Sequence, residues 1–459
     1  MTAPAPQDPH NASDAWARRS RAAVWHPCTQ MKHHEVLPLL AVVAGDGAWL
    51  IDANGKRYLD ACSSWWTNLF GHANPAINAA LARQLGQIEH VMLVGCTHAP
   101  VVELSERLAA LTGLGHAFYG SDGASAVEIA LKMSFHYWRN TGHSTKRCFV
   151  SLKDSYHGET LGALAVTDVA IFRDAYGPLL ADNILTTNPS MGAAARPFSA
   201  QTPRQSLGFS AASEGHAQAA LRDLEALFAQ RHAEISAFIV EPLVQGAAGM
   251  RMYSPAFLAG ARALCDRFGV HLIADEIMTG FGRTGTMFAV EQAGVRPDFM
   301  CLSKGLTGGY LPMSCVLTRD DIYAAFYDDS AARGFLHSHS YTGSALACRA
   351  ALATLDLFES DDVLARNRGC ALRFAALCEP LLSHPKVLGA RHLGQIWAFE
   401  VDSADPAFSR TFFSRGLEQG ILVRPIGNTL YFMPPYVTRD EEFAALVASC
   451  VHILDSLTA

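Results

Sequence analysis

The sequence lacks several features that mark particular classes of protein. No uninterrupted apolar run approaches the length of a membrane-spanning helix, and residues 1–24 lack the apolar core of a secretion signal. The 36 basic and 43 acidic residues give a formal charge of −7, without a sustained basic patch. We therefore expect a cytoplasmic protein that binds neither membranes nor nucleic acid. Its 459 residues suffice for two or three structural units.

Paired or clustered metal and disulfide ligands are also missing. The eleven cysteines form no C-x-x-C motif and no even framework of short spacings, and several lie inside apolar runs. His337 and His339 stand two residues apart without nearby acidic or thiol ligands, which is a poor arrangement for zinc. The sequence thus predicts reduced cysteines and no metal site.

No glycine-rich phosphate loop of the form G-x-x-x-x-G-K-[ST] occurs in the chain. Without it, the apolar run that ends in Asp275 is a poor candidate for the magnesium-binding strand of an ATPase. Residues 280–285 spell G-x-G-x-x-G, but a dinucleotide site places such glycines directly after a strand, and here residues 275–279 intervene. We interpret 280–285 as a loop of close backbone approach, and a nucleotide-binding ATPase or dehydrogenase as a remote alternative.

The most informative stretch runs from Val270 to Pro312. Its apolar runs 270–274 and 299–302 are typical of buried parallel strands, and they lead to Asp275 and Lys304. Reactive groups of open α/β sheets gather at the carboxyl ends of the strands. A lysine can bind the aldehyde of pyridoxal 5'-phosphate, and a carboxylate can hold a proton on its ring nitrogen. The pair therefore predicts a pyridoxal phosphate site, against the alternative of a snorkelling surface lysine.

Two further segments are suited to such a cofactor. A short strand near residues 118–120, a turn of small residues and a helix that continues to Trp138 make an anion site, although small residues also serve simply as a helix cap. Tyr156 follows the strand at 148–150, and it either lies against a flat cofactor or forms part of a half-buried wall.

Three large side chains are candidates for contact with substrate. Trp65 and Trp66 are adjacent, so on a strand at least one must leave the core, and they either pack or line a pocket for an apolar ligand. Arg424 stands between an apolar run and Pro425, where it either binds a substrate carboxylate or forms a structural salt bridge.

The order of the expected elements indicates an α/β fold. We expect an antiparallel meander over residues 42–59 with a turn at Asn54-Gly55, order from near Val24, and an exposed excursion over residues 188–216. The expected domains are a mobile tail (1–20), an N-terminal part of a small domain (21–72), a large cofactor-binding domain (73–345) and a C-terminal part of the small domain (346–459).

The motifs 272–276, 280–285 and 303–309 resemble those of class III pyridoxal-phosphate aminotransferases of fold type I. The resemblance covers the chain from about Val24. It implies a large domain with a mostly parallel seven-stranded sheet, a smaller α+β domain built from both chain ends, and a homodimer with shared active sites.

Further motifs look like the biotin-pathway branch of that family: residues 25–27, 63–66, 98–100, 249–253 and 423–425. This resemblance implies transfer of an amino group from S-adenosylmethionine, or from lysine as in some relatives, to 8-amino-7-oxononanoate. A class III transaminase that acts on ω-amino acids or diamines, with pyruvate or 2-oxoglutarate, is the alternative.

The resemblance also implies roles for individual residues. Lys304 carries the cofactor and shuttles a proton, Asp275 pairs with the pyridinium, and Tyr156 covers the ring near the substrate. Gly123 and Ala124 hold the phosphate. His339 and Ser340 of a second subunit complete the phosphate site, and the substrate site includes Trp65, Trp66, Ser338, Arg424 and Cys28.

Some positions depart from the family pattern. Cys28 stands where some members carry a tyrosine that helps to recognise substrate, so that phenolic contact is absent. Ala124 and Ser340 stand where relatives carry serine and threonine, and Ala247 stands where ornithine-type enzymes carry a glutamate.

Overall fold

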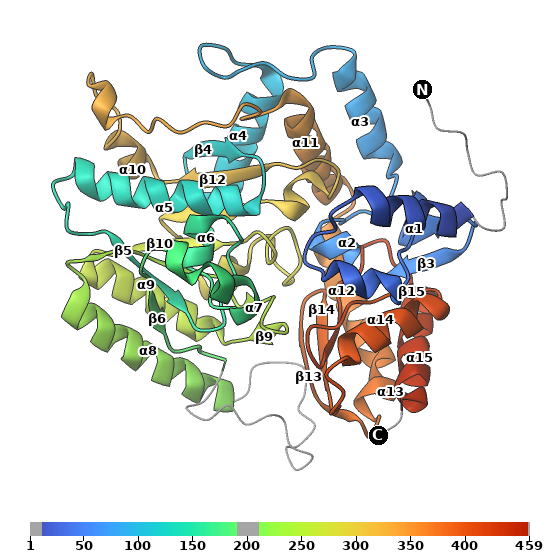
Figure 1. Ribbon diagram of the computed structural model, residues 1–459. Coiled ribbons are helices and arrows are strands. Elements are labelled where there is room, and N and C mark those ends of the chain that lie inside the picture. Colours follow the sequence, from blue (N-terminus) through green and yellow to red (C-terminus); the bar gives the residue numbers. More distant parts are fainter. Residues whose placement is uncertain (1–11, 191–210, 458–459) are drawn as a thin grey trace.

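A seven-stranded sheet forms the centre of the computed structural model, which describes residues 12–190 and 211–457 (Figure 1). The strand order is β4-β12-β11-β10-β7-β5-β6. The pairings from β11 to β6 are all parallel, and β12 is antiparallel to both of its neighbours. The strands are β4 His116–Gly120, β5 Cys148–Leu152, β6 Ile184–Thr186, β7 Ile235–Val240, β10 His271–Asp275, β11 Phe299–Leu302 and β12 Ser314–Thr318. The predicted α/β fold with a mostly parallel sheet is confirmed.

Helices cover both faces of this sheet. Helix α5 (Gly123–Asn140) packs on one face, and α8 (Ala211–Arg231) and α9 (Pro255–Phe268) lie on the other (Figure 1). Successive strand residues therefore point into different cores: Ile273 packs with α5, whereas Leu272 packs with α8 and α9. Burial on both faces explains why β7, β10, β11 and β12 are apolar almost without interruption.

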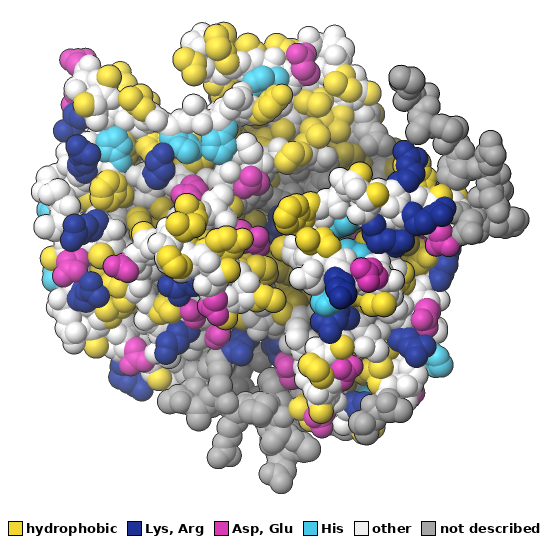
Figure 2. Space-filling view, in the orientation of Figure 1, with side chains coloured by type: hydrophobic (Ala, Val, Ile, Leu, Met, Phe, Trp, Pro, Cys, Tyr) yellow, Lys and Arg dark blue, Asp and Glu magenta, His cyan; other side chains and the backbone are white. Residues whose placement is uncertain are grey.

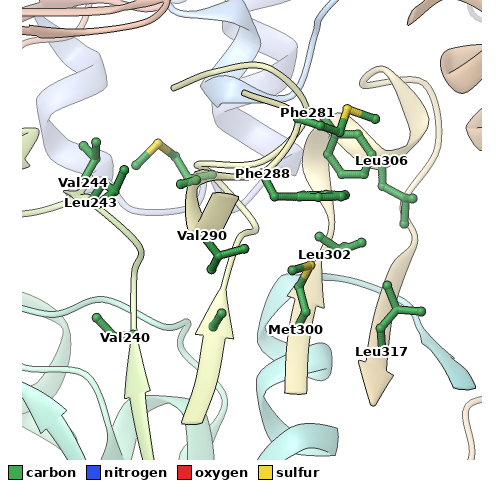
Figure 3. Close-up of a cluster of buried hydrophobic side chains, with 14 of the residues drawn as sticks. Val240, Leu243, Val244, Phe281, Phe288, Val290, Met300, Leu302, Leu306 and Leu317 are labelled. Carbon is green, nitrogen blue, oxygen red and sulfur yellow. The ribbon is translucent and has the colours of Figure 1, made fainter. Parts of the chain in front are cut away.

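The loop after β10 folds back over the carboxyl ends of the strands. Figure 3 shows Phe281 and Phe288 of this loop beside Leu302 and Leu306, above the β11 side chain of Met300. A Cβ added at Gly394 would lie 2.3 Å from the carbonyl carbon of Thr284, so no side chain fits there. The prediction that residues 280–285 form a loop of close backbone approach is confirmed.

A second unit combines both ends of the chain. The meander β1 (Val42–Asp46), β2 (Trp49–Asp52) and β3 (Arg57–Asp60) is antiparallel, as predicted, and β15 (Ile421–Leu422) adds to β3 in parallel. A separate sheet contains β13 (Val387–Leu393), β14 (Ile396–Val401) and β16 (Thr429–Phe432). The helices of this unit are α12 Val363–Leu377, α13 Glu379–Leu382, α14 Phe408–Glu418 and α15 Asp440–Ser456. The exact domain boundaries stay a prediction.

The remaining elements connect these units. The helices are α2 Ser63–Trp66, α3 Pro75–Leu85, α4 Ala99–Thr112, α6 Leu161–Ala165, α7 Ala170–Arg173, α10 Asp320–Ala324 and α11 Ala345–Ser360. A small hairpin contains β8 Val244–Gln245 and β9 Arg251–Met252. Short 3-10 turns are η2 Met31–Glu35, η3 Asp174–Leu179, η4 Ala289–Ala293, η5 Lys304–Thr307 and η6 Ala331–Arg333. In residues 12–190 and 211–457, no helix has both the length and the apolar character needed to cross a bilayer.

Two expectations about order differ from the structure. Residues 12–20, assigned to a tail, belong to helix α1 (Ala12–Ala23), which buries Ala17, so the expectation that order begins near Val24 is wrong. The alanine- and arginine-rich composition of α1 has high helix propensity, and the backbone N–H of Ser13 donates to Asn54 Oδ1 at 3.1 Å. Residues 1–11 of the expected tail and 191–210 of the expected excursion lie outside the described residues. Residues 211–216 belong to α8.

Candidate active site

Five residues, four of them predicted from sequence, lie at the ends of strands that finish at the same side of the large sheet. Gly123 follows β4, Tyr156 follows β5, Glu241 follows β7, Asp275 ends β10 and Lys304 follows β11. These strands all run in one direction, so their carboxyl ends lie together, where open α/β sheets bind ligands. Figure 2 shows this face of the molecule, which is hollowed between the large domain and the unit built from both chain ends.

Asp275 is held in place by two donors. Its Oδ2 lies 2.7 Å from His157 Nδ1, and its Oδ1 accepts from the backbone N–H of Ile277 at 3.2 Å. Asp275 is 4% exposed and His157 is 2% exposed. Hydrogen bonds of this kind fix the orientation of a carboxyl group. A carboxylate so fixed is suited to hold a proton on a ligand ring nitrogen.

His157 was not among the residues predicted from sequence, although it adjoins Tyr156. Its Nε2 is buried and has no hydrogen-bond partner among the described residues. The ring nitrogen that faces Asp275 is thus engaged, whereas the second ring nitrogen faces no polar group of the described residues. The signal that could have found it is its place in the turn that follows a buried strand.

Lys304 has a side chain prepared for nucleophilic chemistry. Protein surrounds Lys304 on nearly all sides, although part of its surface is accessible to solvent. This burial lowers the pKa of the Lys304 amine to about 8, and the negative charges of Asp275 and Glu241 act in the opposite direction. Its Nζ lies 4.5 Å from the centre of the Trp66 ring. In the part of the chain that the structure describes, Nζ has no hydrogen bond or ion pair, so the amine is free to react.

Glu241 fixes the backbone around the site. Its carboxylate accepts from the N–H groups of Tyr156 and Gly246, each at 3.0 Å. Burial raises the pKa of Glu241 to about 7, although His157 acts in the opposite direction. Glu241 is not among the residues predicted from sequence, and its position directly after the apolar run of β7 is the signal that could have found it.

Tyr156 belongs to a small polar cluster with Glu159 and Cys28. The Tyr156 hydroxyl donates to Glu159 Oε1 at 2.9 Å, and the Cys28 thiol lies 3.8 Å from the same oxygen. Burial, reinforced by the negative charge of Glu159, raises the pKa of the Tyr156 hydroxyl. The structure thus brings Cys28 to Tyr156, from distant parts of the chain, and adds Glu159, which sequence reasoning missed.

The loop before α5 has the geometry of an anion site. Asp122 Oδ1 accepts from the N–H of Ser125 at 2.9 Å and caps the helix. A Cβ at Gly123 would lie 3.1 Å from the side chain of Ile277, so the loop packs tightly against the segment that follows Asp275. Helix α5 has 18 residues, and its first N–H groups, including that of Ala124, point beyond its N-terminus.

The two tryptophans lie on a turn with unusual backbone geometry. Ser63, Ser64, Trp65 and Trp66 have φ values of 49°, 46°, 70° and 69°. Each left-handed non-glycine residue costs roughly 1–2 kcal/mol, so tertiary contacts must hold this turn. The tryptophans lie on a turn and not on a strand, and one of them does leave the core: Trp65 is 46% exposed and Trp66 is 6% exposed.

Arg424 lies beside the exposed tryptophan. Its guanidinium is 5.4 Å from the Trp65 ring centre and 5.9 Å from that of Phe413. Among the described residues Arg424 forms no ion pair, which removes the alternative of a structural salt bridge there. An exposed, unpaired guanidinium on an aromatic ring is suited to bind a carboxylate.

The segment around His339 lies near the loop before α5. His339 Nδ1 is 3.0 Å from Ser121 Oγ of the same chain, and its Nε2 is 3.1 Å from His337 Nε2. Ser338 and Ser340 are exposed. The expected contribution of His339, Ser340 and Ser338 to shared sites stays a prediction.

The comparison with known families decides the classification. The sequence model described as "Aminotransferase class-III" matches residues 30–454. The chain belongs to the class-III aminotransferases. Relatives that carry the name adenosylmethionine-8-amino-7-oxononanoate aminotransferase include proteins of two bacteria. The protein of Helicobacter pylori is 44% identical and the match covers 95% of this chain and 96% of the relative. That of Anoxybacillus flavithermus is 38% identical, with coverage of 95% and 96%.

Solved structures agree with this class-III aminotransferase assignment. The enzyme of the same name from Methanocaldococcus jannaschii superposes with a TM-score of 0.89 at 32% identity, covering 97% of this chain and 100% of that chain. A pyridoxal-phosphate-bound amine transaminase from an uncultivated Pseudomonas species gives a TM-score of 0.84 at 31% identity, with coverage of 93% and 97%.

The residues of this class-III aminotransferase fit pyridoxal phosphate. The sheet edge offers an amine without a polar partner on Lys304, a buried carboxylate on Asp275 and a capped helix N-terminus at Gly123. These groups match the aldehyde, ring nitrogen and phosphate of the cofactor in chemical type.

Proposed function

We propose that this chain is a pyridoxal-phosphate-dependent transaminase of biotin biosynthesis. It transfers an amino group from S-adenosylmethionine to 8-amino-7-oxononanoate and yields 7,8-diaminononanoate. The observation that carries the reaction type is the desolvated Lys304 amine at the same sheet edge as the buried Asp275. The names of relatives at 37–44% identity over most of the chain support the choice of substrates.

Bound pyridoxal phosphate would supply an aldehyde that takes up the amino group and a ring that accepts electrons from the substrate carbon. Lys304 Nζ would take the proton from the amino-bearing carbon of the donor and deliver it to the former aldehyde carbon of the cofactor, for which its pKa of about 8 is suitable. Asp275, fixed by His157, holds a proton on the ring nitrogen. The N–H groups near Gly123 and Ala124 hold the phosphate, and Tyr156 excludes water from above the ring.

The mouth of the site supports a substrate with an apolar chain and a distant carboxylate. Trp65 and Trp66 offer the apolar surface, and Arg424 lies beyond them with an unpaired guanidinium. Cys28 and Ser338 complete the proposed substrate site. Both substrates use this pocket in turn, because a ping-pong transaminase releases the first product before the second substrate binds.

Replacing Arg424 with glutamine should raise the KM for 8-amino-7-oxononanoate by about 10- to 100-fold, because charge-assisted hydrogen bonds contribute about 1.5–3 kcal/mol. The kcat should change much less, since Arg424 lies away from the reacting carbon. Steady-state kinetics with the full-length holoenzyme measure both values. Arg415→Gln is a suitable control, because Arg415 pairs with Glu418 on the exposed side of α14. Equal KM values for the Arg424 variant and the wild type would contradict the assignment.

We also propose a cytoplasmic homodimer in which His339 and Ser340 of each chain complete the partner's phosphate site. Exposed apolar side chains support a dimer face: Met92, Val94, Leu336 and Tyr341 are 61–83% exposed. The His90 and Tyr341 rings lie 5.0 Å apart, so the two segments adjoin. All eleven cysteines are free thiols, which supports a reducing compartment. Sedimentation of the holoenzyme should give the mass of two chains.

A donor screen tests the proposed function. The purified holoenzyme is incubated with 8-amino-7-oxononanoate and, separately, S-adenosylmethionine, lysine, 4-aminobutyrate or ornithine, and the product is identified by mass spectrometry. We expect 7,8-diaminononanoate with S-adenosylmethionine. Turnover of ω-amino acids or diamines with pyruvate or 2-oxoglutarate, and none with 8-amino-7-oxononanoate, would overturn the substrate assignment and leave the reaction type intact.

A further inference from the structure

The left-handed turn that carries both tryptophans is anchored by one buried carboxylate. Asp60, at the end of β3, is fully buried. Its Oδ2 accepts from Ser64 Oγ at 2.8 Å and from His72 Nε2 at 3.0 Å, and its Oδ1 accepts from the backbone N–H of Cys62 at 3.3 Å. The carboxylate thus contacts both the entry and the middle of the turn.

The charge of Asp60 is maintained by these contacts. Burial alone would raise the pKa of this carboxyl group, but the hydrogen bonds from His72 and Ser64 outweigh burial and hold the pKa below its usual value. His72 is itself oriented, because Asn68 Nδ2 lies 3.3 Å from its Nδ1. Asp60 therefore remains an ionised acceptor for the donors around it.

Contacts from the opposite side complete the support of the turn. Ser63 Oγ donates to the carbonyl of Met433 at 2.7 Å, and Trp66 Nε1 donates to the Tyr431 hydroxyl at 3.1 Å. Asp60 also pairs in register with Leu422 of β15, two residues before Arg424. The same strand residue thus lies between the tryptophan turn and the segment that carries Arg424.

We propose that Asp60, together with His72, is a positioning residue for substrate specificity: it holds the Ser63–Trp66 turn so that Trp65 lies beside Arg424 and Trp66 beneath Lys304. The observations that carry this inference are the four left-handed residues and the contacts of the buried Asp60 with Cys62, directly before them, and with Ser64, in their middle. The inference rests on the proposed function for the identity of the substrate, but not for the geometry of the turn.

Replacing Asp60 with asparagine keeps the shape of the side chain and removes its charge. We expect the KM for 8-amino-7-oxononanoate to rise at least about tenfold and kcat to change by less than about threefold, because the reacting groups stay in place. Asp52→Asn is the matched control. Asp52 is a buried carboxylate of the same sheet that accepts from Asn54 N–H, Lys56 N–H and the Tyr58 hydroxyl, without contact to the turn. The Asp52→Asn variant should leave the KM for 8-amino-7-oxononanoate unchanged.

A pair of variants at Ser64 tests the same inference if Asp60→Asn does not fold. Ser64→Ala and Ser64→Gly both remove the hydrogen bond to Asp60, but only glycine adopts a φ of 46° without steric cost. Alanine should therefore raise KM more than glycine. An equal or larger increase with glycine would overturn the inference.

Crystal structures of the wild type and the Asp60→Asn holoenzyme separate this inference from the proposed function. We expect the variant to lose positive φ values within residues 63–66 and to displace Trp65. An unchanged turn, or an unchanged KM with a displaced turn, overturns the role of Asp60. A wild type without activity on 8-amino-7-oxononanoate would instead refute the proposed substrate, and the backbone comparison would still decide whether Asp60 holds the turn.

Discussion

Replacement of Lys304 by alanine should lower the rate of transamination by at least about 10⁴-fold, because one change removes both the covalent anchor and the proton carrier. The structure gives a physical reason, since burial lowers the pKa of Lys304 to about 8 and no polar group of the described residues engages its Nζ. Single-turnover kinetics with each substrate measure the loss. Borohydride reduction followed by peptide mass analysis should show the cofactor attached to Lys304 in the wild type and to no peptide in the variant.

Lys146 provides a stringent control for this experiment. Its pKa is also lowered to about 8 by burial, but its Nζ donates to the carbonyls of His232 and Ile235 at 2.6 and 3.0 Å. Lys146→Met should reduce the melting temperature and leave the kcat within about threefold of the wild type. If Lys304→Ala behaved in the same way, with activity retained, the assignment of Lys304 would be wrong.

Replacement of Asp275 by asparagine should reduce kcat on the order of 10³-fold, the size of effect seen when one preorganised electrostatic group is removed from a buried site. The amide cannot balance the charge of a protonated ring nitrogen, and its NH₂ group competes for the contact with His157. Stopped-flow measurement of each half-reaction should show both slowed. The affinity for pyridoxal phosphate, determined by equilibrium dialysis, should fall as well, which gives a readout independent of turnover.

Asp298→Asn distinguishes this effect from the simple loss of a buried acid. Asp298 is 1% exposed and accepts from Leu272 N–H at 2.6 Å and from Arg262 at 2.7 Å, and Arg319 binds its other oxygen. Asp298 precedes β11 and so lies at the amino ends of the parallel strands, whereas Asp275 lies at their carboxyl ends. Its replacement should lower the free energy of unfolding without selective loss of kcat. Wild-type half-reaction rates in the Asp275 variant would refute the proposed role of Asp275.

The strands around the site could be predicted from sequence because each is a short apolar run that stops at a polar residue. Burial on both faces produces this pattern, and it located Asp275 and Lys304 at the ends of β10 and β11. The same rule, applied to the apolar run of β7, would have located Glu241 directly after it. The mistaken tail over residues 12–20 has a different cause, since the composition of α1 suits both a solvated segment and a helix.

The turn at residues 63–66 could not have been predicted in this way. Local preference disfavours left-handed geometry at serine and tryptophan, so the conformation depends on Asp60, Met433 and Tyr431, which contact the turn from other elements. The meeting of Cys28 with Glu159 likewise joins segments 131 residues apart. Such contacts carry no periodic signal in the chain.

The parallel pairing of β3 with β15 has a consequence for how this enzyme is made. Leu59 and Asp60 pair with Ile421 and Leu422, so during synthesis the β3 edge has no partner until most of the polypeptide has left the ribosome. Arg424 reaches Trp65 only after that late closure. The proposed substrate-binding pair of Trp65 and Arg424 can thus form only after the strands that carry Asp275 and Lys304 have been synthesised.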